Sequence, residues 1–340
     1  MTRVAVNGFG RIGRLALRVM CERPELGLEP VAINDPGADA ETFALLVEFD
    51  SVHGRYREAC LGEGDVIAVG ERSLAFSRAS DPLQLPWRAL GVDTVLECSG
   101  RFKKLPQLAA HHAAGARAVA VSAPIEGDVP NVVVGVNHDA FDLRSATVFG
   151  AASCTTNCLA PIVRIVHDTL GIERGLVTTI HDPTNSQNVV DAADKDPRRA
   201  RSALVNLVPT STNSAHAVTR IVPELLGKLD SIAVRAPVLN ASLVDAVFQV
   251  AHDTERDEVN AIFAAAASSP RFDGILGYET RPLVSSDFAH DPRSGIVDAL
   301  STRVTDRRLV KVLAWYDNEW GYANRLVELA AMAAGNLVRR

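Results

Sequence analysis

The chain has 340 residues, which is enough for two domains with sizeable cores. Its composition is ordinary for a globular protein, and a net charge of −6 without long basic runs does not indicate nucleic acid as a partner. No apolar run approaches the roughly 18 residues of a membrane helix. We therefore expect no membrane association. Because the N-terminus leads straight into a strand at 3–7, we also expect no signal peptide. Five scattered cysteines are unlike a disulfide framework, so we expect reduced thiols and a cytoplasmic protein.

The N-terminal region predicts a nucleotide-binding unit. An apolar strand at 3–7 leads into the G-x-G-x-x-G run at 8–13, which a helical pattern follows. In such a turn the first glycine makes the turn, the second lets a pyrophosphate approach the backbone, and the third lets helix and strand pack. A second strand, 30–34, ends at Asp35, where a carboxylate is suited to bind ribose hydroxyls and to disfavour a 2′-phosphate. The pattern predicts NAD rather than NADP.

Strands and helices continue to alternate up to residue 152. We expect an antiparallel excursion at 62–76, a helix at 105–114, and strands at 92–100, 118–122, 131–135 and 147–149. This alternation predicts a doubly wound parallel sheet. His111 and His112 are adjacent on the expected helix and point in different directions, so we interpret both as surface residues and expect no metal site.

A cysteine with polar neighbours marks the centre of the chain. Ser153 is a favourable N-cap, and Cys154 would then lie in a first helical turn, where exposed N–H groups and the helix dipole favour a thiolate. His181, at the end of the strand-like run 175–180, is the nearest suitable base downstream. A buried structural cysteine is the alternative interpretation, which the polar flanks disfavour. We expect Cys158, one turn further on, to be structural.

The second half of the chain has a different pattern. Apolar residues alternate at 232–236, 241–250, 296–301 and 308–315, and helical stretches occur at 157–170 and 255–267. This predicts an α+β domain with a mostly antiparallel sheet. We expect a dinucleotide-binding Rossmann domain at 1–152, completed by a C-terminal helix in 318–340, and a catalytic domain at 153–317.

The run 153–161, Ser-Cys-Thr-Thr-Asn-Cys-Leu-Ala-Pro, resembles the active-site signature of phosphorylating glyceraldehyde-3-phosphate dehydrogenases. The resemblance extends from 4–13 to 315–322 and so covers nearly the whole chain. It implies that Cys154 attacks the aldehyde of glyceraldehyde 3-phosphate, that His181 takes the hydroxyl proton while hydride passes to NAD, and that inorganic phosphate releases the thioester as 1,3-bisphosphoglycerate. It also implies a homotetramer.

The resemblance and the glycine turn together assign the binding residues. The positions expected to bind the substrate and the inorganic anion are Ser153, Thr155, Thr156, Thr184, Arg201, Thr212, Asn213 and Arg235. Those expected to bind the cofactor are Gly8, Gly10, Arg11, Ile12, Gly13, Asp35, Arg78, Ser122, Asn318 and Tyr322. We interpret Arg198 and Arg199 as a solvated surface pair.

The chain departs from the common glycolytic pattern at several places, of which two concern the site. Asp182 and Pro183 follow His181 where a small or aromatic pair is usual, and Asn213 stands where the family normally has glycine. Asparagine tolerates a positive φ better than other non-glycine residues, so a backbone N–H contact to an anion could survive there.

Three alternatives to the glycolytic activity remain open. The pieces at 181–185, 239–243 and 277–283 resemble the branch associated with arsenic resistance, in which arsenate replaces phosphate and the product is 1-arseno-3-phosphoglycerate. Erythrose-4-phosphate dehydrogenase is another relative, which Thr184 disfavours. An inactive dinucleotide-binding regulator is the third, since a fold does not fix a function. It is disfavoured because Cys154, His181, Thr184, Arg235 and Asn318 are all present.

Overall fold

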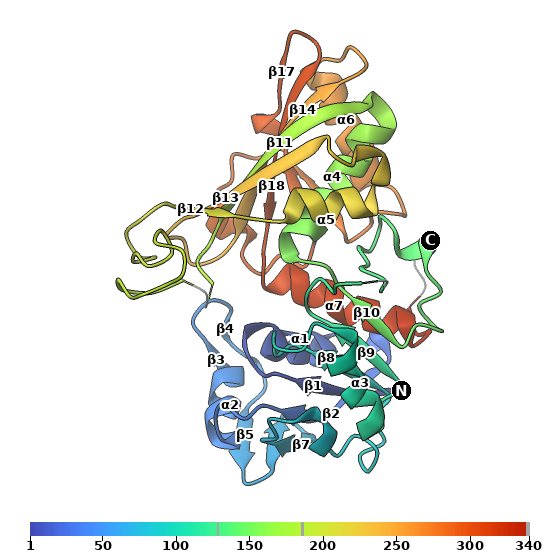
Figure 1. The fold of residues 1–340 in the computed structure, drawn as a ribbon, viewed down its shortest axis with the longest axis vertical. Coiled ribbons are helices and arrows are strands. Elements are labelled where there is room, and N and C mark those ends of the chain that lie inside the picture. Colours follow the sequence, from blue (N-terminus) through green and yellow to red (C-terminus); the bar gives the residue numbers. More distant parts are fainter. Residues whose placement is uncertain (128, 185–186, 338–340) are drawn as a thin grey trace. The chain divides into compact units, whose positions relative to one another are not determined.

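A computed structural model describes residues 1–127, 129–184 and 187–337. The chain forms two compact units, of which the first comprises Met1–Ser153 with Tyr322–Arg340 and the second comprises Cys154–Gly321 (Figure 1). Within the described ranges, no helix is both long and apolar enough to span a bilayer.

The first unit is built on an eight-stranded sheet in the order β10-β9-β8-β1-β2-β7-β6-β5. Its strands are β1 (Thr2–Asn7), β2 (Leu28–Asn34), β5 (Cys60–Glu63), β6 (Val66–Val69), β7 (Arg72–Ser77), β8 (Thr94–Glu97), β9 (Ala118–Val121) and β10 (Val148–Gly150). Pairing is parallel from β10 to β7 and antiparallel from β7 to β5. The order reverses beside β1, so the carboxyl ends of β1, β2 and β8 meet at a switch point, where such sheets bind nucleotides.

Short helices and a hairpin complete this unit. They are α1 (Arg11–Glu22), α2 (Ala40–Glu48), α3 (Leu105–Ala114), the pair β3 (Phe49–Asp50) and β4 (Gly54–Arg55), and the part of α7 (Trp320–Ala333) from Tyr322 onward. The carboxylate of Asp39 caps α2 by accepting from the N–H of Thr42 at 2.9 Å. Helix α7 is held by Arg23, which donates to Asn324 at 3.1 Å and to Glu328 at 2.6 Å. Residues 338–340 of the expected C-terminal helix lie outside the described residues.

Two expectations for this unit are wrong. The run 131–135 forms turns instead of a strand, apart from one isolated bridge between Asn131 and Gly150. Nearby side chains satisfy the backbone of this run in place of a ladder. Asn137 accepts from the N–H of Val133 at 2.7 Å and donates to the carbonyl of Asn131 at 3.0 Å, and His138 accepts from the N–H of Gly135 at 3.1 Å. His111 is fully buried rather than on the surface, because its ring bridges Trp87 and Glu97.

The second unit is built on a mostly antiparallel sheet in the order β12-β13-β11-β14-β18-β16-β15, with β17 paired to β18. Its strands are β11 (Ile172–His181), β12 (Val208–Ser211), β13 (Leu229–Arg235), β14 (Ser242–Val250), β15 (Leu276–Glu279), β16 (Gly295–Asp298), β17 (Arg303–Thr305) and β18 (Leu309–Tyr316). Buried and half-buried residues alternate along β14 because one face of the sheet packs on the core. Among the described strands of this second sheet, only β11–β13 and β15–β16 pair in parallel.

Helix α4 (Cys154–Leu170) packs against β14, β16 and β18, beside α5 (Ser214–Ile221) and α6 (Arg256–Ala267). Its contact with β16 is close, since a Cβ added to Gly295 would lie 2.9 Å from the sulfur of Cys158. Cys158 is therefore a packed residue of the core, and α4 presents its first turn at a fixed position over the sheet.

Candidate active site

The candidate nucleophile lies at the start of a helix. Helix α4 begins at Cys154, so the sulfur belongs to the first turn, where backbone N–H groups have no partner within the helix. Ala152, two residues earlier, adopts a φ of +54°, which is unusual for a residue other than glycine. The hydroxyl of Tyr322 donates to the carbonyl of Ala152 at 3.0 Å and so helps to hold this conformation.

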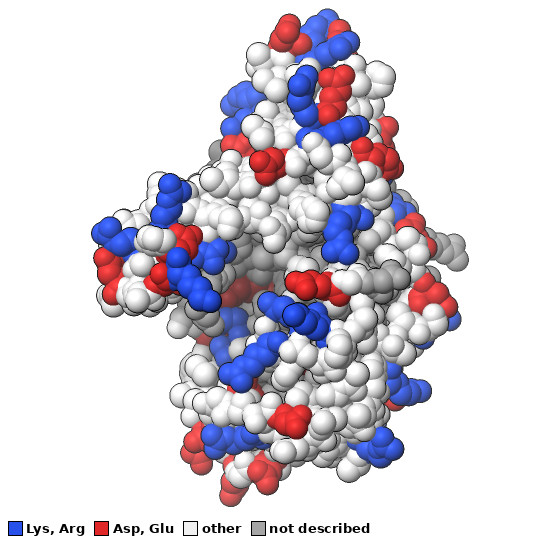
Figure 2. All heavy atoms as spheres, viewed as in Figure 1, with Lys and Arg blue, Asp and Glu red and all other residues white. Residues whose placement is uncertain are grey.

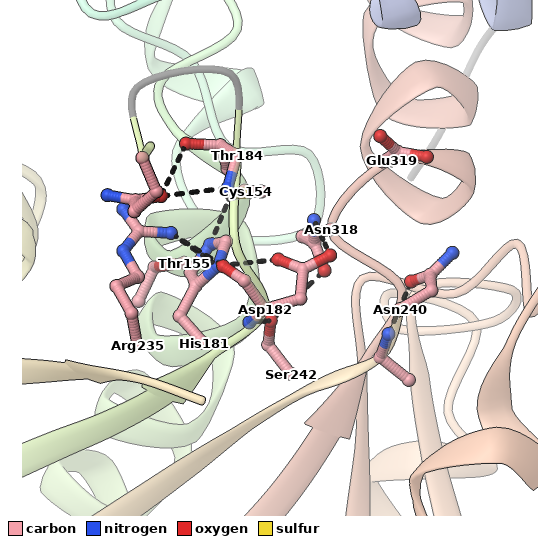
Figure 3. A network of polar contacts seen from close by, with 12 residues as sticks. Cys154, Thr155, His181, Asp182, Thr184, Arg235, Asn240, Ser242, Asn318 and Glu319 are labelled. Atoms are coloured by element: carbon pink, nitrogen blue, oxygen red, sulfur yellow. Dashed lines mark hydrogen bonds and ion pairs between the residues drawn. The ribbon is translucent and has the colours of Figure 1, made fainter. Parts of the chain in front are cut away.

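The candidate base faces this sulfur. His181 ends β11, and its Nε2 lies 3.7 Å from the Sγ of Cys154 (Figure 3). The ring is buried and meets the ring of Tyr316 edge-on, with the centroids 6.1 Å apart. The hydroxyl of Tyr316 in turn bonds the hydroxyl of Thr155 at 2.8 Å. The structure thus brings Cys154 and His181 into the contact that a thiol and its base require.

Burial and nearby charges determine the protonation of His181. Burial lowers its pKa, but the contacts with Asp182 and with Cys154 raise it, while the charge of Arg235 lowers it, and the net result is a pKa of about 9. The ring is therefore largely protonated at neutral pH. A protonated ring can donate a hydrogen bond from Nε2 to the facing sulfur.

Asp182 is a functional candidate that sequence reasoning missed. Its side chain is buried, its Oδ1 lies 2.7 Å from His181 Nδ1, and its Oδ2 accepts from Asn318 at 3.0 Å. Asn318 also accepts from the hydroxyl of Ser242 at 3.0 Å. The sequence shows Asp182 only as a departure from a family pattern. A carboxylate directly after a candidate base, at a strand end, was the signal available.

Arg235 supplies positive charge beside the base. The parallel register of β11 and β13 pairs Arg235 with His181, and its Nη1 lies 2.7 Å from His181 Nδ1 and 3.0 Å from the carbonyl of Asp182. Its Nε is buried and has no hydrogen-bond partner in the described part of the chain, and the same holds for Nε2 of Gln187. The backbone N–H of Thr184 donates to Oε1 of Gln187 at 2.8 Å, so Thr184 lies next to this second unused donor.

The structure brings Arg199, and not Arg201, to the candidate anion-binding residues. Arg199 Nε donates to the hydroxyl of Thr210 at 2.8 Å, and its charge acts on Arg235. Arg201 is 64% exposed and pairs with Asp191 at 2.7 Å instead. Our interpretation of Arg199 as a solvated residue is therefore wrong, because the turn that carries both arginines directs their side chains differently.

None of the remaining candidates for substrate and anion binding has a positive φ. Thr156 is fully buried in α4, Ser153 directly precedes that helix, and Thr212 bonds Ser214 at 3.3 Å. Asn213 stands at the N-cap of α5 with a φ of −103°. The positive φ considered for Asn213 is thus not adopted.

The first unit contains a cleft at its topological switch point. The cleft has a volume of about 450 Å³ and is lined by Gly8, Gly10, Asp35, Cys98 and Ser99, among others. A Cβ on Gly8 would lie 2.2 Å from the nitrogen of Ser99, and one on Gly13 would lie 2.2 Å from the carbonyl of Gly8. A Cβ on Gly10 would meet nothing within 4 Å. The first and third glycines are needed for packing, and the second leaves open space beside the backbone, which fits a pyrophosphate.

Other candidate cofactor residues fall into two groups. Asp35 lines the cleft and accepts from the N–H groups of Phe9 at 2.6 Å and Gly37 at 2.7 Å, which fixes the carboxylate. The others do not line the cleft, and most of them bond other parts of the protein. Arg11 binds the carboxylate of Asp50, Arg78 approaches the carbonyl of Pro36, and the N–H of Ser122 donates to the backbone carbonyl of Glu97. Ile12 and Gly13 lie in the turn, and Tyr322 is bonded to Ala152.

Family comparisons agree with both units. The family model described as "Glyceraldehyde 3-phosphate dehydrogenase, NAD binding domain" matches residues 2–105, and that described as "Glyceraldehyde 3-phosphate dehydrogenase, C-terminal domain" matches residues 153–318. The chain belongs to the glyceraldehyde-3-phosphate dehydrogenase family. The resemblance found in the sequence and the expected fold class, a parallel Rossmann sheet with a mostly antiparallel second sheet, are thereby confirmed.

Curated members of the glyceraldehyde-3-phosphate dehydrogenase family match along nearly their full length. Glyceraldehyde-3-phosphate dehydrogenase 3 of Nostoc sp. is 51% identical over 98% of this chain and 99% of its own. Glyceraldehyde-3-phosphate dehydrogenase of Pseudomonas aeruginosa is 50% identical over 98% of both chains, and that of Zymomonas mobilis is 47% identical over 98% of this chain and 99% of its own.

Proposed function

We propose that the chain is an NAD-dependent, phosphorylating glyceraldehyde-3-phosphate dehydrogenase. It oxidises glyceraldehyde 3-phosphate to 1,3-bisphosphoglycerate through a thioester on Cys154. The observation that carries this proposal is the 3.7 Å contact between Cys154 Sγ at the start of α4 and His181 Nε2, in a chain of this family. An inactive regulator would not require a thiol and an imidazole in this contact.

The reaction uses the two side chains in sequence. The Cys154 thiolate attacks the aldehyde carbon, and the carbonyl oxygen takes a proton from the His181 imidazolium to give a thiohemiacetal. His181, now neutral, takes that hydroxyl proton back as hydride leaves the carbon, and a thioester remains. NAD, when bound, accepts the hydride. The backbone N–H of Cys154, in the first turn of α4, is a donor for the developing oxyanion.

The phosphate groups are proposed to bind to donors around Arg235. Arg235 Nε and Gln187 Nε2 are buried donors without partners among the described residues, and they support an anionic ligand here, since a buried donor is costly unless it is bonded. Arg199, with Thr210, adds a second guanidinium, and Thr184 lies beside Gln187. Two cationic groups suit a substrate phosphate and an inorganic anion.

The inorganic anion is proposed to be either phosphate or arsenate. Both are tetrahedral oxyanions of equal charge, so guanidinium and hydroxyl donors recognise them alike. The sequence pieces at 181–185 and 239–243 support the arsenic-resistance branch, in which the product is 1-arseno-3-phosphoglycerate. Thr184 supports glyceraldehyde 3-phosphate rather than erythrose 4-phosphate as the aldehyde.

We also propose a homotetramer in the cytoplasm. The loop between β11 and β12 (187–207) carries exposed aliphatic side chains, namely Val189, Val190, Leu204, Val205 and Leu207. Figure 2 shows acidic and basic side chains interspersed on this loop, which projects at the left of the view. Exposed apolar residues among charges are typical of a surface that another chain covers. All five cysteines are free, which supports a reducing compartment. Light scattering should give a mass four times that of the chain.

A turnover assay tests the activity. Purified protein should form NADH from glyceraldehyde 3-phosphate and NAD when phosphate is present, and only a single burst on the order of one NADH per site when phosphate is omitted. Replacing NAD by NADP should lower kcat/KM. The absence of NADH formation under all of these conditions would reject the proposed activity.

A further inference from the structure

The carboxylate of Asp182 lies directly behind the candidate base. Only 2% of this residue is exposed, and its Oδ1 is 2.7 Å from Nδ1 of His181, on the side of the ring opposite the thiol contact at Nε2. This Oδ1 accepts no aligned hydrogen bond in the described part of the chain. A buried carboxylate oxygen beside a ring nitrogen is costly unless it accepts the proton of that nitrogen.

Two kinds of neighbour compete for Nδ1 of His181. The carbonyl oxygen of Asp182, at 2.8 Å, and its carboxylate can only accept a hydrogen bond, so they favour a proton on Nδ1. Arg235 Nη1, at 2.7 Å, can only donate and favours a bare Nδ1. With a bare Nδ1, the neutral ring would carry its proton on Nε2 and could not accept one from substrate. The outcome of this competition decides whether His181 can act as a base.

We propose that Asp182 is a positioning residue that keeps the proton of neutral His181 on Nδ1, so that Nε2 accepts the substrate hydroxyl proton during hydride transfer. This inference rests on the proposed function, because it concerns the base of that reaction. Asp182 itself does not touch the reacting atoms, and it acts only through the imidazole, as carboxylates behind basic histidines do.

The second oxygen of the carboxylate prevents its rotation. Asp182 Oδ2 accepts from Asn318 Nδ2 at 3.0 Å, and the amide oxygen of Asn318 accepts from Ser242 at 3.0 Å (Figure 3). The Ser242 hydroxyl is also the acceptor for the backbone N–H of Asp182 at 3.2 Å. Residues from β14 and from the segment after β18 thus anchor both the backbone and the side chain of Asp182.

Three other charged or titratable groups of the described residues face the His181 ring. They are Cys154 from α4, Arg235 from β13 and Tyr316 from β18. Arg235 lowers the pKa of His181, whereas Asp182 and Cys154 raise it. In the thiohemiacetal the sulfur is neutral, so Asp182 is the anion that remains against Arg235. Its removal should therefore lower the pKa of His181 in that intermediate.

The test is the pH dependence of hydride transfer in Asp182→Asn, measured as single-turnover NADH formation. The rate should rise with pH as the His181 imidazolium loses its proton, and we call this rise the rising limb. We expect the rising limb to move to lower pH in Asp182→Asn, because the imidazolium loses the carboxylate that stabilises it and its pKa falls. We also expect the plateau rate to fall by about 10- to 100-fold, with KM for NAD unchanged within about twofold. This loss is smaller than that of a general base, about 10²- to 10⁴-fold, because the carbonyl of Asp182 still accepts from Nδ1.

Asp245→Asn is the matched control. Asp245 lies on β14, next to β11, and also has one buried carboxylate oxygen without a hydrogen-bond partner among the described residues. Its other oxygen accepts from Lys311 at 2.7 Å and not from the imidazole. We expect the wild-type pH profile in this variant. Asp182→Glu keeps the negative charge, so its rising limb should lie at a pH between those of Asp182→Asn and wild type. A lowered plateau with an unmoved limb in Asp182→Asn would overturn the proposal, because a merely structural role has that effect.

Alkylation of Cys154 by iodoacetamide gives a readout independent of turnover. In wild type, the rate should show an inflection that disappears in His181→Asn and therefore reports the imidazolium. Asp182→Asn should move this inflection to lower pH, even in a protein without dehydrogenase activity. An unmoved inflection rejects the role of Asp182 and leaves the proposed function intact, whereas failure of NADH formation in wild type rejects the function alone.

Discussion

Trp87 donates its indole N–H to Nδ1 of His111 across 3.1 Å, and this bond determines the tautomer of the buried ring. Because indole can only donate, Nδ1 accepts and the ring proton lies on Nε2, where it is donated to Glu97 at 3.0 Å. Glu97 also accepts from the side chain of Asn7 at 2.5 Å and from the N–H of Ser99 at 2.8 Å. The carboxylate of Glu97 thus connects the buried histidine to Asn7 and Ser99, which line the nucleotide cleft.

Replacing this histidine by an apolar residue should destabilise the protein. His111→Leu leaves the Trp87 N–H without its acceptor and removes one donor from the Glu97 carboxylate, so we expect the free energy of unfolding to fall by about 3 kcal/mol. His112→Leu is the control, with an expected loss under about 1 kcal/mol, because His112 is half-buried and the one hydrogen bond of its ring among the described residues is to the carbonyl of Ala116. Urea titration measures both. Equal losses would contradict the assigned role of His111.

Two glycines of the same turn should separate folding from cofactor binding. Gly10→Ala adds a methyl group into open space, so we expect an unchanged Tm but a KM for NAD that rises about tenfold or more, because the methyl group occupies the path of the pyrophosphate. Gly8→Ala should fail to fold or lose most of its stability, since φ is +90° and the new Cβ would lie 2.2 Å from Ser99. Thermal unfolding and steady-state kinetics distinguish the two. Unchanged NAD kinetics in Gly10→Ala would exclude this turn from the cofactor site.

Arg199 should govern use of the inorganic anion. Arg199→Lys replaces a planar fork by a point charge, so we expect the KM for phosphate and for arsenate to rise together by about tenfold, with NAD kinetics unchanged. Arg201→Lys should change neither KM by more than about twofold, because Arg201 is exposed and bound to Asp191. Steady-state kinetics with each anion decide this. The opposite ranking would restore Arg201 as the anion residue, and separate responses to phosphate and arsenate would mean two binding sites.

Cys154 should be the cysteine that iodoacetamide labels first. Burial raises the pKa of Cys158 and Cys98 strongly and that of Cys21 to about 11, so these thiols remain protonated at neutral pH. Peptide mass spectrometry after brief labelling should find the adduct on Cys154, with loss of dehydrogenase activity. Cys154→Ser should lower turnover on the order of 10³-fold or more, whereas Cys158→Ala should retain most of it. A first adduct on any other cysteine would argue against Cys154 as nucleophile.

Local patterns predicted the parts of the site that depend on neighbouring residues. The glycine turn followed from a strand before it and a helix after it, and these are β1 and α1. The helix start at Cys154 followed from a polar run that caps a helix. Family membership followed from nine consecutive residues at 153–161. In each case the determining residues lie close together in the sequence.

Tertiary contacts decided what sequence reasoning missed. His111 is buried because Trp87 and Glu97, from other parts of the chain, need the two sides of its ring. The side chains of Arg199 and Arg201 diverge on one turn, and residue type alone does not give their directions. Sequence reasoning did not single out Asp182, because side chains alternate along a strand and Asp182 should then point away from His181. In the structure β11 ends at His181, and the side chain of Asp182 lies beside the ring of His181.

If the proposed tetramer forms through the loop at 187–207, we expect activity to depend on protein concentration. Arg199 lies on the same loop as the exposed valines and leucines, so any contact that buries those side chains also restricts the segment that carries the guanidinium. By mass action, dilution releases such contacts. Activity per chain should then decline when the enzyme is diluted and return when it is concentrated again, and an inorganic anion that binds Arg199 should slow the decline by favouring the associated form.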